Sequence, residues 1–290
     1  MRKYPKYPLK KGDFILKAEN NFLNKHFICL SSLFVLGNGV ITAPSANANE
    51  YNFLAFLISS VLAVAVAVVF FILPLNRLTA CFFMIFGFYV FGDTFIDFIK
   101  FIKNNLLPDT QPFLIVLPFV LILVYAAFKR VELLLKFALI CFFAVVGVIL
   151  LFFLATLKDF NIKNIFIYQM PKITAVTEQM LPYLKTITLP VGLLPILAKT
   201  NGIKKSANII GVSVGCLLFG VCILNSVLLF GFPFASVLPY PYSSAGSTVT
   251  FGNLFTRMDG LLYFVYLASS FAKCIVGIEI IKKSRNLFVP

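Results

Sequence analysis

Long apolar runs separated by short polar gaps dominate the chain. The six clearest runs are rich in Phe, Leu, Ile and Val, and they cover residues 53–73, 78–99, 113–128, 131–157, 209–232 and 261–281. A hydrocarbon core about 30 Å thick is crossed by roughly 20 apolar helical residues, so each run is apolar enough to span a bilayer. A weaker run over 27–46 and a broken run over 180–198 add two more crossings. The pattern predicts an all-α integral membrane protein with about eight transmembrane helices.

Composition agrees with this interpretation. Charged residues make up 12% of the chain and the mean hydropathy is +0.95, far from the values of soluble domains. The 290 residues leave room for one membrane domain and no soluble catalytic domain. We expect a basic cytoplasmic segment at 1–27, a transmembrane domain at 28–282 and a cytoplasmic tail at 283–290. The first segment lacks the build of a cleavable signal peptide, so the first span would direct its own insertion.

The basic residues predict an orientation. The net charge is +14, and Lys and Arg gather at the ends of spans, where they favour anionic lipid over nucleic acid as the partner. Several precede the first span, whereas the gap at 45–52 holds none. The positive-inside rule therefore predicts that both termini are cytoplasmic.

Motifs for metal binding or covalent catalysis are missing from the sequence. Its six cysteines lie in or beside apolar runs without a C-x-x-C spacing, and His26 is its one histidine. No P-loop, H-E-x-x-H or Ser/His/Asp grouping occurs. We expect no cofactor, no metal site and no enzymatic activity.

Two helix breaks fall at membrane depth. The first is Gly37-Asn38-Gly39 in the first span, and the second contains Pro190 and Gly192 in the sixth. Many secondary transporters bind their substrate at such breaks, where freed backbone groups meet its charges. Gly can also serve close helix packing, and Pro can simply kink a helix. The first and sixth spans are related positions in a five-plus-five inverted repeat, so we expect the two breaks to face each other and form a ligand pocket.

A few charges lie within or beside the spans. Asp93 is deep enough in the third span to be a ligand-binding candidate. Asp97, one turn later, is expected to pair with Lys100 at the outer interface. Glu132 and Lys136 have the favourable acid-before-base spacing of four, which predicts a structural ion pair at the inner mouth of the fifth span.

Three stretches together resemble a known family. NNLLPDTQPF at 104–113 is similar to its turn between the third and fourth spans, and YAAFKRVELLLK at 125–136 is similar to the motif that opens its fifth span. YPYSSAGSTVTFGNLFTRMDGLLYFVYLASSFAK at 240–273 resembles its Tyr-Pro loop, Arg-x-Asp pair and a span with a late Lys. The resemblance covers residues 28 to about 280. The family is the B subunit of bacterial spore germinant receptors, related to the amino acid/polyamine/organocation (APC) transporters.

The resemblance implies a LeuT-like fold of two inverted five-helix halves, with the last two helices missing here. It implies a small ligand, most often an amino acid, between the first and sixth spans, and a place in the spore inner membrane beside A and C subunits. The residues that it carries over for structural or coupling roles are Glu132, Arg257, Asp259 and Lys273, with Lys136 beside them.

Three functions remain open at this level. The leading hypothesis is recognition of a small germinant, with signalling through partner subunits. The alternatives are a cation-coupled amino acid transporter and a truncated, non-binding scaffold.

Overall fold

The computed structural model describes residues 11–42, 51–165, 172–235, 237–238, 240–248 and 258–288, and within them all regular structure is helical. The α-helices are α1 (Lys11–Leu36), α2 (Gly39–Thr42), α3 (Asn52–Ile72), α4 (Arg77–Asn105), α5 (Pro112–Ala127), α6 (Val131–Thr156), α7 (Ile173–Tyr183), α8 (Leu189–Val191), α9 (Leu194–Thr200), α10 (Lys205–Ala235), α11 (Pro241–Thr248) and α12 (Asp259–Phe288). Two short 3₁₀ segments, η1 (Leu157–Asp159) and η2 (Ile162–Ile165), follow α6, and a π-helical segment, η3 (Leu184–Thr188), joins α7 to α8.

The helices confirm an all-α integral membrane protein. Six helical segments of the described chain are long and apolar enough to cross a membrane, namely Asn52–Ile72, Arg77–Asn105, Val131–Asp159, Ile173–Thr200, Lys205–Phe232 and Asp259–Leu287. The remaining two expected crossings correspond to shorter apolar helices, Phe22–Leu36 and Pro112–Ala127. The inverted repeat and the domain boundaries stay predictions, although α1 runs without interruption across the expected boundary at residue 27.

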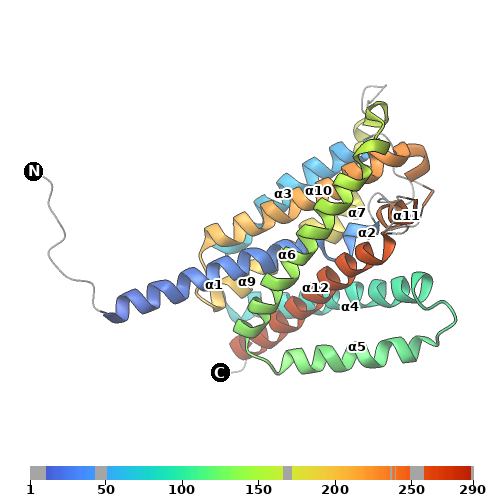
Figure 1. Cartoon of the computed structure of the whole chain (residues 1–290). Helices are drawn as coiled ribbons and strands as arrows, with labels where there is room; N and C mark the ends of the chain where they lie inside the picture. Colours follow the sequence, from blue (N-terminus) through green and yellow to red (C-terminus); the bar gives the residue numbers. More distant parts are fainter. Residues whose placement is uncertain are drawn as a thin grey trace, which may run out of the picture.

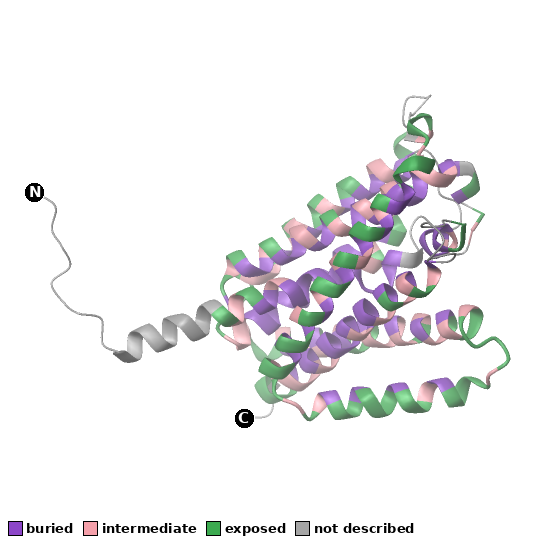
Figure 2. Ribbon diagram, in the orientation of Figure 1, coloured by how far each residue is buried: buried purple, intermediate pink, exposed green. Residues whose placement is uncertain are grey.

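The bundle is built around α1. This helix packs against α10, α6 and α12, and α12 packs in turn along α4 (Figure 1). From Leu30 to Leu36 every residue of α1 is buried, whereas α5 at the edge of the bundle exposes large apolar side chains such as Phe113 and Leu121 (Figure 2). Apolar side chains that point outward suit contact with lipid. The end of α1, together with the segments Ile173–Thr200 and Asp259–Leu287, lies in the protein interior.

Small residues let α10 lie close to α1. A Cβ atom added at Gly211 would lie 1.8 Å from Ser31 Oγ, and one added at Gly215 would lie 2.7 Å from Val35 Cβ. The Ser32 hydroxyl donates to the Gly211 carbonyl across this contact, at 2.9 Å. Close approach through glycine is how helices pack where lipid offers no hydrophobic driving force.

Candidate functional site

The first predicted helix break is present in the structure. Helix α1 ends at Leu36, and α2 begins at Gly39. Gly37 lies between them with a φ of 40°, a left-handed conformation that favours glycine. Ser269 of α12 donates its hydroxyl to the Gly37 carbonyl at 3.0 Å. The same hydroxyl lies 2.7 Å from the Val265 carbonyl of its own helix, so its one hydrogen is shared between the break and α12.

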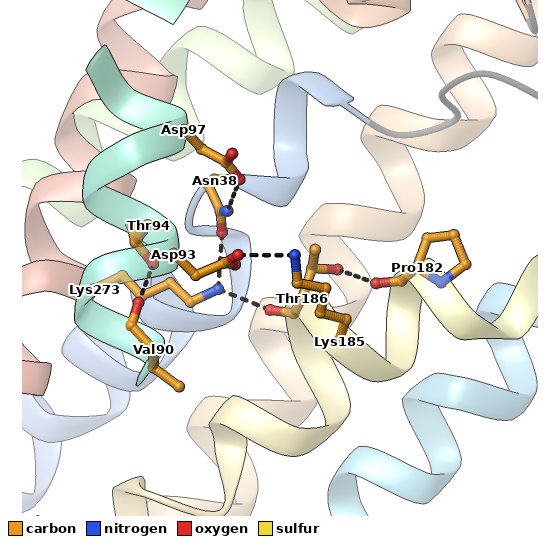
Figure 3. A network of polar contacts seen from close by, with 9 residues as sticks. All are labelled: Asn38, Val90, Asp93, Thr94, Asp97, Pro182, Lys185, Thr186 and Lys273. Carbon is orange, nitrogen blue, oxygen red and sulfur yellow. Dashed lines mark hydrogen bonds and ion pairs between the residues drawn. The ribbon is translucent and has the colours of Figure 1, made fainter. Parts of the chain in front are cut away.

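A buried lysine from α12 lies against this break. Lys273 is 1% exposed, and its Nζ donates to Asn38 Oδ1 at 2.9 Å and to the Thr186 carbonyl at 2.8 Å. Asn38 Nδ2 donates in turn to Asp97 Oδ2 at 2.7 Å (Figure 3). A Cβ at Gly37 would lie 2.6 Å from Lys273 Cδ, so glycine at this position also makes room for the lysine stem.

The sequence explains why the Thr186 carbonyl is available. In a regular α-helix this carbonyl would accept the N–H of the residue four positions later, and that residue is Pro190, which has no N–H. The chain is π-helical from Leu184 to Thr188 around it, an irregularity that often marks functional sites. Pro190 thus contributes to the site through the backbone acceptor that it leaves free.

A second charged pair lies beside the lysine. Lys185 Nζ lies 2.8 Å from Asp93 Oδ1, and the two side chains are 53% and 21% exposed. We call Asn38, Asp93, Asp97, Lys185, Thr186 and Lys273 the polar cluster (Figure 3). Its two carboxylates come from α4, and its two ammonium groups come from η3 and α12. Because Lys273 is buried and Lys185 is half exposed, the cluster reaches from the interior toward the surface.

The other predicted ligand-binding residues lie at varying distances from this cluster. At Gly39 an added Cβ would lie 2.8 Å from Phe219 Cε2 and 3.6 Å from Thr186 Oγ1. At Gly192 an added Cβ would lie 3.2 Å from the Leu189 carbonyl and 3.4 Å from the Phe70 ring. The first break therefore meets the broken sixth span at Thr186, whereas Gly192 packs against α3. Ligand binding by these residues stays a prediction.

Two predicted ion pairs are wrong. Asp97 accepts from Asn38 on another helix instead of pairing with Lys100. Lys136 lies over the Phe22 ring, 5.7 Å from its centroid, and no ion pair with Glu132 occurs among the described residues. In both cases the contact across helices replaced the pairing expected from spacing along one helix.

The carried-over Arg-x-Asp motif is described only in part. Arg257 lies outside the described residues. Asp259 begins α12, where Gly246 of α11 approaches so closely that an added Cβ would lie 2.9 Å from Asp259 Cα. Its structural or coupling role stays a prediction.

Sequence reasoning missed Lys185, Thr186 and Ser269. A signal existed for Thr186, because a proline four positions after it frees its carbonyl. Lys185 and Ser269 carried no such signal, since their partners come from distant helices. Within the described residues, no group of three or more His, Cys, Asp or Glu side chains could hold a metal ion.

The fold and the polar cluster define a polytopic helical membrane protein with broken helices at its centre, an arrangement that many secondary transporters share. Residues 23–288 match the family model described as spore germination protein (spore permease), and the chain belongs to this family. Comparisons with curated proteins and with solved structures found no match.

Proposed function

We propose that this chain is the B-type subunit of a spore germinant receptor and that it binds a small germinant at the polar cluster. The ligand is an amino acid in the simplest case, and the signal passes to A and C partner subunits in the spore inner membrane, with both termini cytoplasmic. The observation that carries the proposal is the fully buried Lys273 ammonium against the α1 break. Ionisable groups at membrane depth are costly and mark functional sites by default.

The chemistry of the cluster supports a zwitterionic ligand. Lys273 Nζ uses two of its three donors on Asn38 Oδ1 and the Thr186 carbonyl, which leaves one for a ligand carboxylate. The Asp93 and Asp97 carboxylates on the neighbouring helix suit a ligand ammonium group. The Asp93–Lys185 pair is partly exposed, and such pairs contribute little to stability, about 0–1 kcal/mol. Either partner can therefore exchange the other for a ligand group at small cost.

A glycine substitution tests the site without removing a charge. Gly39→Leu forces the Phe219 ring and the Thr186 side chain to shift, because a Cβ at Gly39 would already lie 2.8 Å from Phe219 Cε2. We expect spores that carry this variant to need at least tenfold more germinant, or to stop responding. The amount of subunit in the spore membrane is measured alongside, so that a lost response is separated from a loss of protein. Gly147→Leu in α6 is the matched control, because a Cβ at Gly147 meets nothing within 4 Å. An unchanged concentration dependence for Gly39→Leu would place the ligand elsewhere.

Cation-coupled amino acid transport is the second candidate, because broken helices around a polar cluster are also a transporter arrangement. Amino acid flux into proteoliposomes distinguishes it from a receptor. A scaffold that binds no ligand is the third candidate. A ligand-induced rise in the thermal midpoint, followed by far-UV circular dichroism because the chain has no Trp, would exclude the scaffold.

A further inference from the structure

A second polar pocket lies away from the polar cluster. It has a volume of about 490 Å³ and is lined by α1, the turn between α5 and α6, the start of α6, Asn201 after α9 and the last turns of α12. Its charged residues are Lys129, Arg130, Glu132, Glu279, Lys282 and Lys283. Glu279 is six positions beyond Lys273 in α12, about 9 Å at ~1.5 Å per residue. We call this the basic pocket.

The charges of the basic pocket favour an anion. Four cationic and two carboxylate side chains line it, which leaves a net charge of +2. Lys282 is already engaged, because its Nζ donates to Glu279 Oε1 at 3.1 Å and to the Ala127 carbonyl at 2.8 Å. Lys283 Nζ lies 3.4 Å from Asn201 Oδ1, a long contact to a neutral acceptor. Lys129 Nζ lies over the Tyr125 ring, 4.4 Å from its centroid, a contact that uses none of its hydrogen-bond donors. Arg130, Lys283 and the Lys129 donors therefore remain to bind a negatively charged group.

Glu279 indicates that the ligand also carries a hydrogen-bond donor. The residue is 2% exposed, and its Oε1 accepts from Lys282. Its Oε2 atom is buried and has no hydrogen-bond partner within the described part of the chain. A buried carboxylate oxygen without a donor is costly, so a molecule that offers a hydroxyl or amine donor beside its anionic group would complete the site.

We propose that the basic pocket binds a glycerol phosphate group. The phosphate interacts with Lys129, Arg130 and Lys283, since the guanidinium fork matches phosphate oxygens and lysine binds them as a point charge. A glycerol hydroxyl donates to Glu279 Oε2 once the Glu279 side chain turns this buried oxygen toward the pocket. Leu23 and Phe128 in the wall of the pocket contact the glycerol carbons. The same group occurs in a phosphatidylglycerol headgroup and in free glycerol phosphate. This inference does not depend on germinant binding at the polar cluster.

Binding of free glycerol phosphate is measured on the full chain in phosphatidylcholine nanodiscs, with radiolabelled glycerol phosphate and with sulfate as a competitor that has no donor. We expect Arg130→Gln or Lys283→Gln to weaken glycerol phosphate binding roughly tenfold, the loss of one charge-assisted contact. Lys204→Gln is the matched control, because Lys204 is exposed and lies outside the pocket.

The role of Glu279 is tested by comparing the affinity for glycerol phosphate with the affinity for sulfate. Glu279→Gln releases Lys282, which raises the affinity for any anion, but it also removes the acceptor for the glycerol hydroxyl. We therefore expect the preference for glycerol phosphate over sulfate to fall roughly tenfold. An unchanged preference would overturn the assignment of Glu279.

A parallel arm distinguishes the two sources of the group. The chain is purified from mixed phosphatidylglycerol and phosphatidylcholine nanodiscs, and retained lipid is counted by native mass spectrometry. Retention of phosphatidylglycerol that Arg130→Gln and Lys283→Gln abolish identifies a headgroup site. Saturable binding of free glycerol phosphate without such retention identifies a soluble ligand. The proposal is overturned if neither occurs, or if Lys204→Gln weakens binding as much as the pocket variants.

Discussion

Replacing Lys273 with Met tests whether the buried ammonium serves the ligand or the fold. Met keeps much of the apolar stem and removes the charge and its donors. The acceptors Asn38 Oδ1 and the Thr186 carbonyl lose their donor, at about 1–3 kcal/mol each. Removing a buried charge relieves a desolvation cost of several kcal/mol. We expect the free energy of unfolding to stay within about 2 kcal/mol of wild type, while the germinant response is lost.

The matched change is Asn38→Ala. It leaves the buried Lys273 ammonium with the Thr186 carbonyl as its remaining hydrogen-bond acceptor among the described residues, and it removes the donor from Asp97. Leaving a buried charge short of partners costs about 3 kcal/mol, the lower end of the range for a broken buried pair. Asn38→Ala should therefore destabilise the protein more than Lys273→Met does. The double variant should lose less than the sum of the two single losses, because both variants remove the Lys273–Asn38 contact. It should still lose more than Lys273→Met, by the Asn38–Asp97 hydrogen bond.

The assay is unfolding of the purified chain in micelles by SDS, followed by far-UV circular dichroism, together with a germination dose–response for each variant. The reasoning is refuted if Lys273→Met destabilises the protein more than Asn38→Ala. That order would mean that the ammonium stabilises the fold through the nearby carboxylates. A normal germinant response of Lys273→Met would remove the polar cluster from the ligand site.

Three further predictions concern single side chains. Gly37→Ala should lower the free energy of unfolding by about 1–3 kcal/mol, because the φ is 40° and the new Cβ would lie 2.6 Å from Lys273 Cδ; SDS unfolding measures it. Gly211→Ala should lower the free energy of unfolding by a similar amount, about 1–3 kcal/mol, because its Cβ would lie 1.8 Å from Ser31 Oγ and would push α10 away from α1. SDS unfolding and the yield of monodisperse protein measure this effect. Lys185→Gln should change stability by less than about 1 kcal/mol and still shift the germinant dose–response, because its ion pair is half exposed.

Controls separate these effects from general sensitivity to substitution. Gly147→Ala places a methyl group in the interior of α6 where nothing lies within 4 Å, so it should not lower the free energy of unfolding and, by helix propensity, should raise it by up to about 1 kcal/mol. If Gly147→Ala lowered the free energy of unfolding as much as Gly211→Ala, the α1–α10 contact would not be the cause of the Gly211→Ala effect. Lys103 is exposed in the last turn of α4, and Lys103→Gln should leave the dose–response unchanged. A shift equal to that of Lys185→Gln would implicate net charge instead of the pair with Asp93.

The apolar pattern by itself determined the class of protein and most of its helices. Lipid demands about 20 apolar residues per crossing and internal hydrogen bonds for every backbone group, so the runs that became α3, α6 and α10 could be recognised without any tertiary information. The break at 37–39 was visible for a similar local reason, because glycine permits the left-handed backbone that Gly37 adopts. Pro190 was informative for a local reason as well, because proline has no N–H and so leaves the Thr186 carbonyl without its usual helical donor.

Only the tertiary structure decided which polar groups meet. Asp97 binds Asn38, 59 positions away, and Lys273 binds Asn38 across 235 positions. Spacing along one helix had favoured Lys100 for Asp97, yet a pair of that kind is worth only about 0.2–0.5 kcal/mol. A buried ammonium or amide without a partner costs more than that. The packing of α1 against α12, and of α12 along α4, therefore determined the partners, and no local pattern in the sequence encodes that packing.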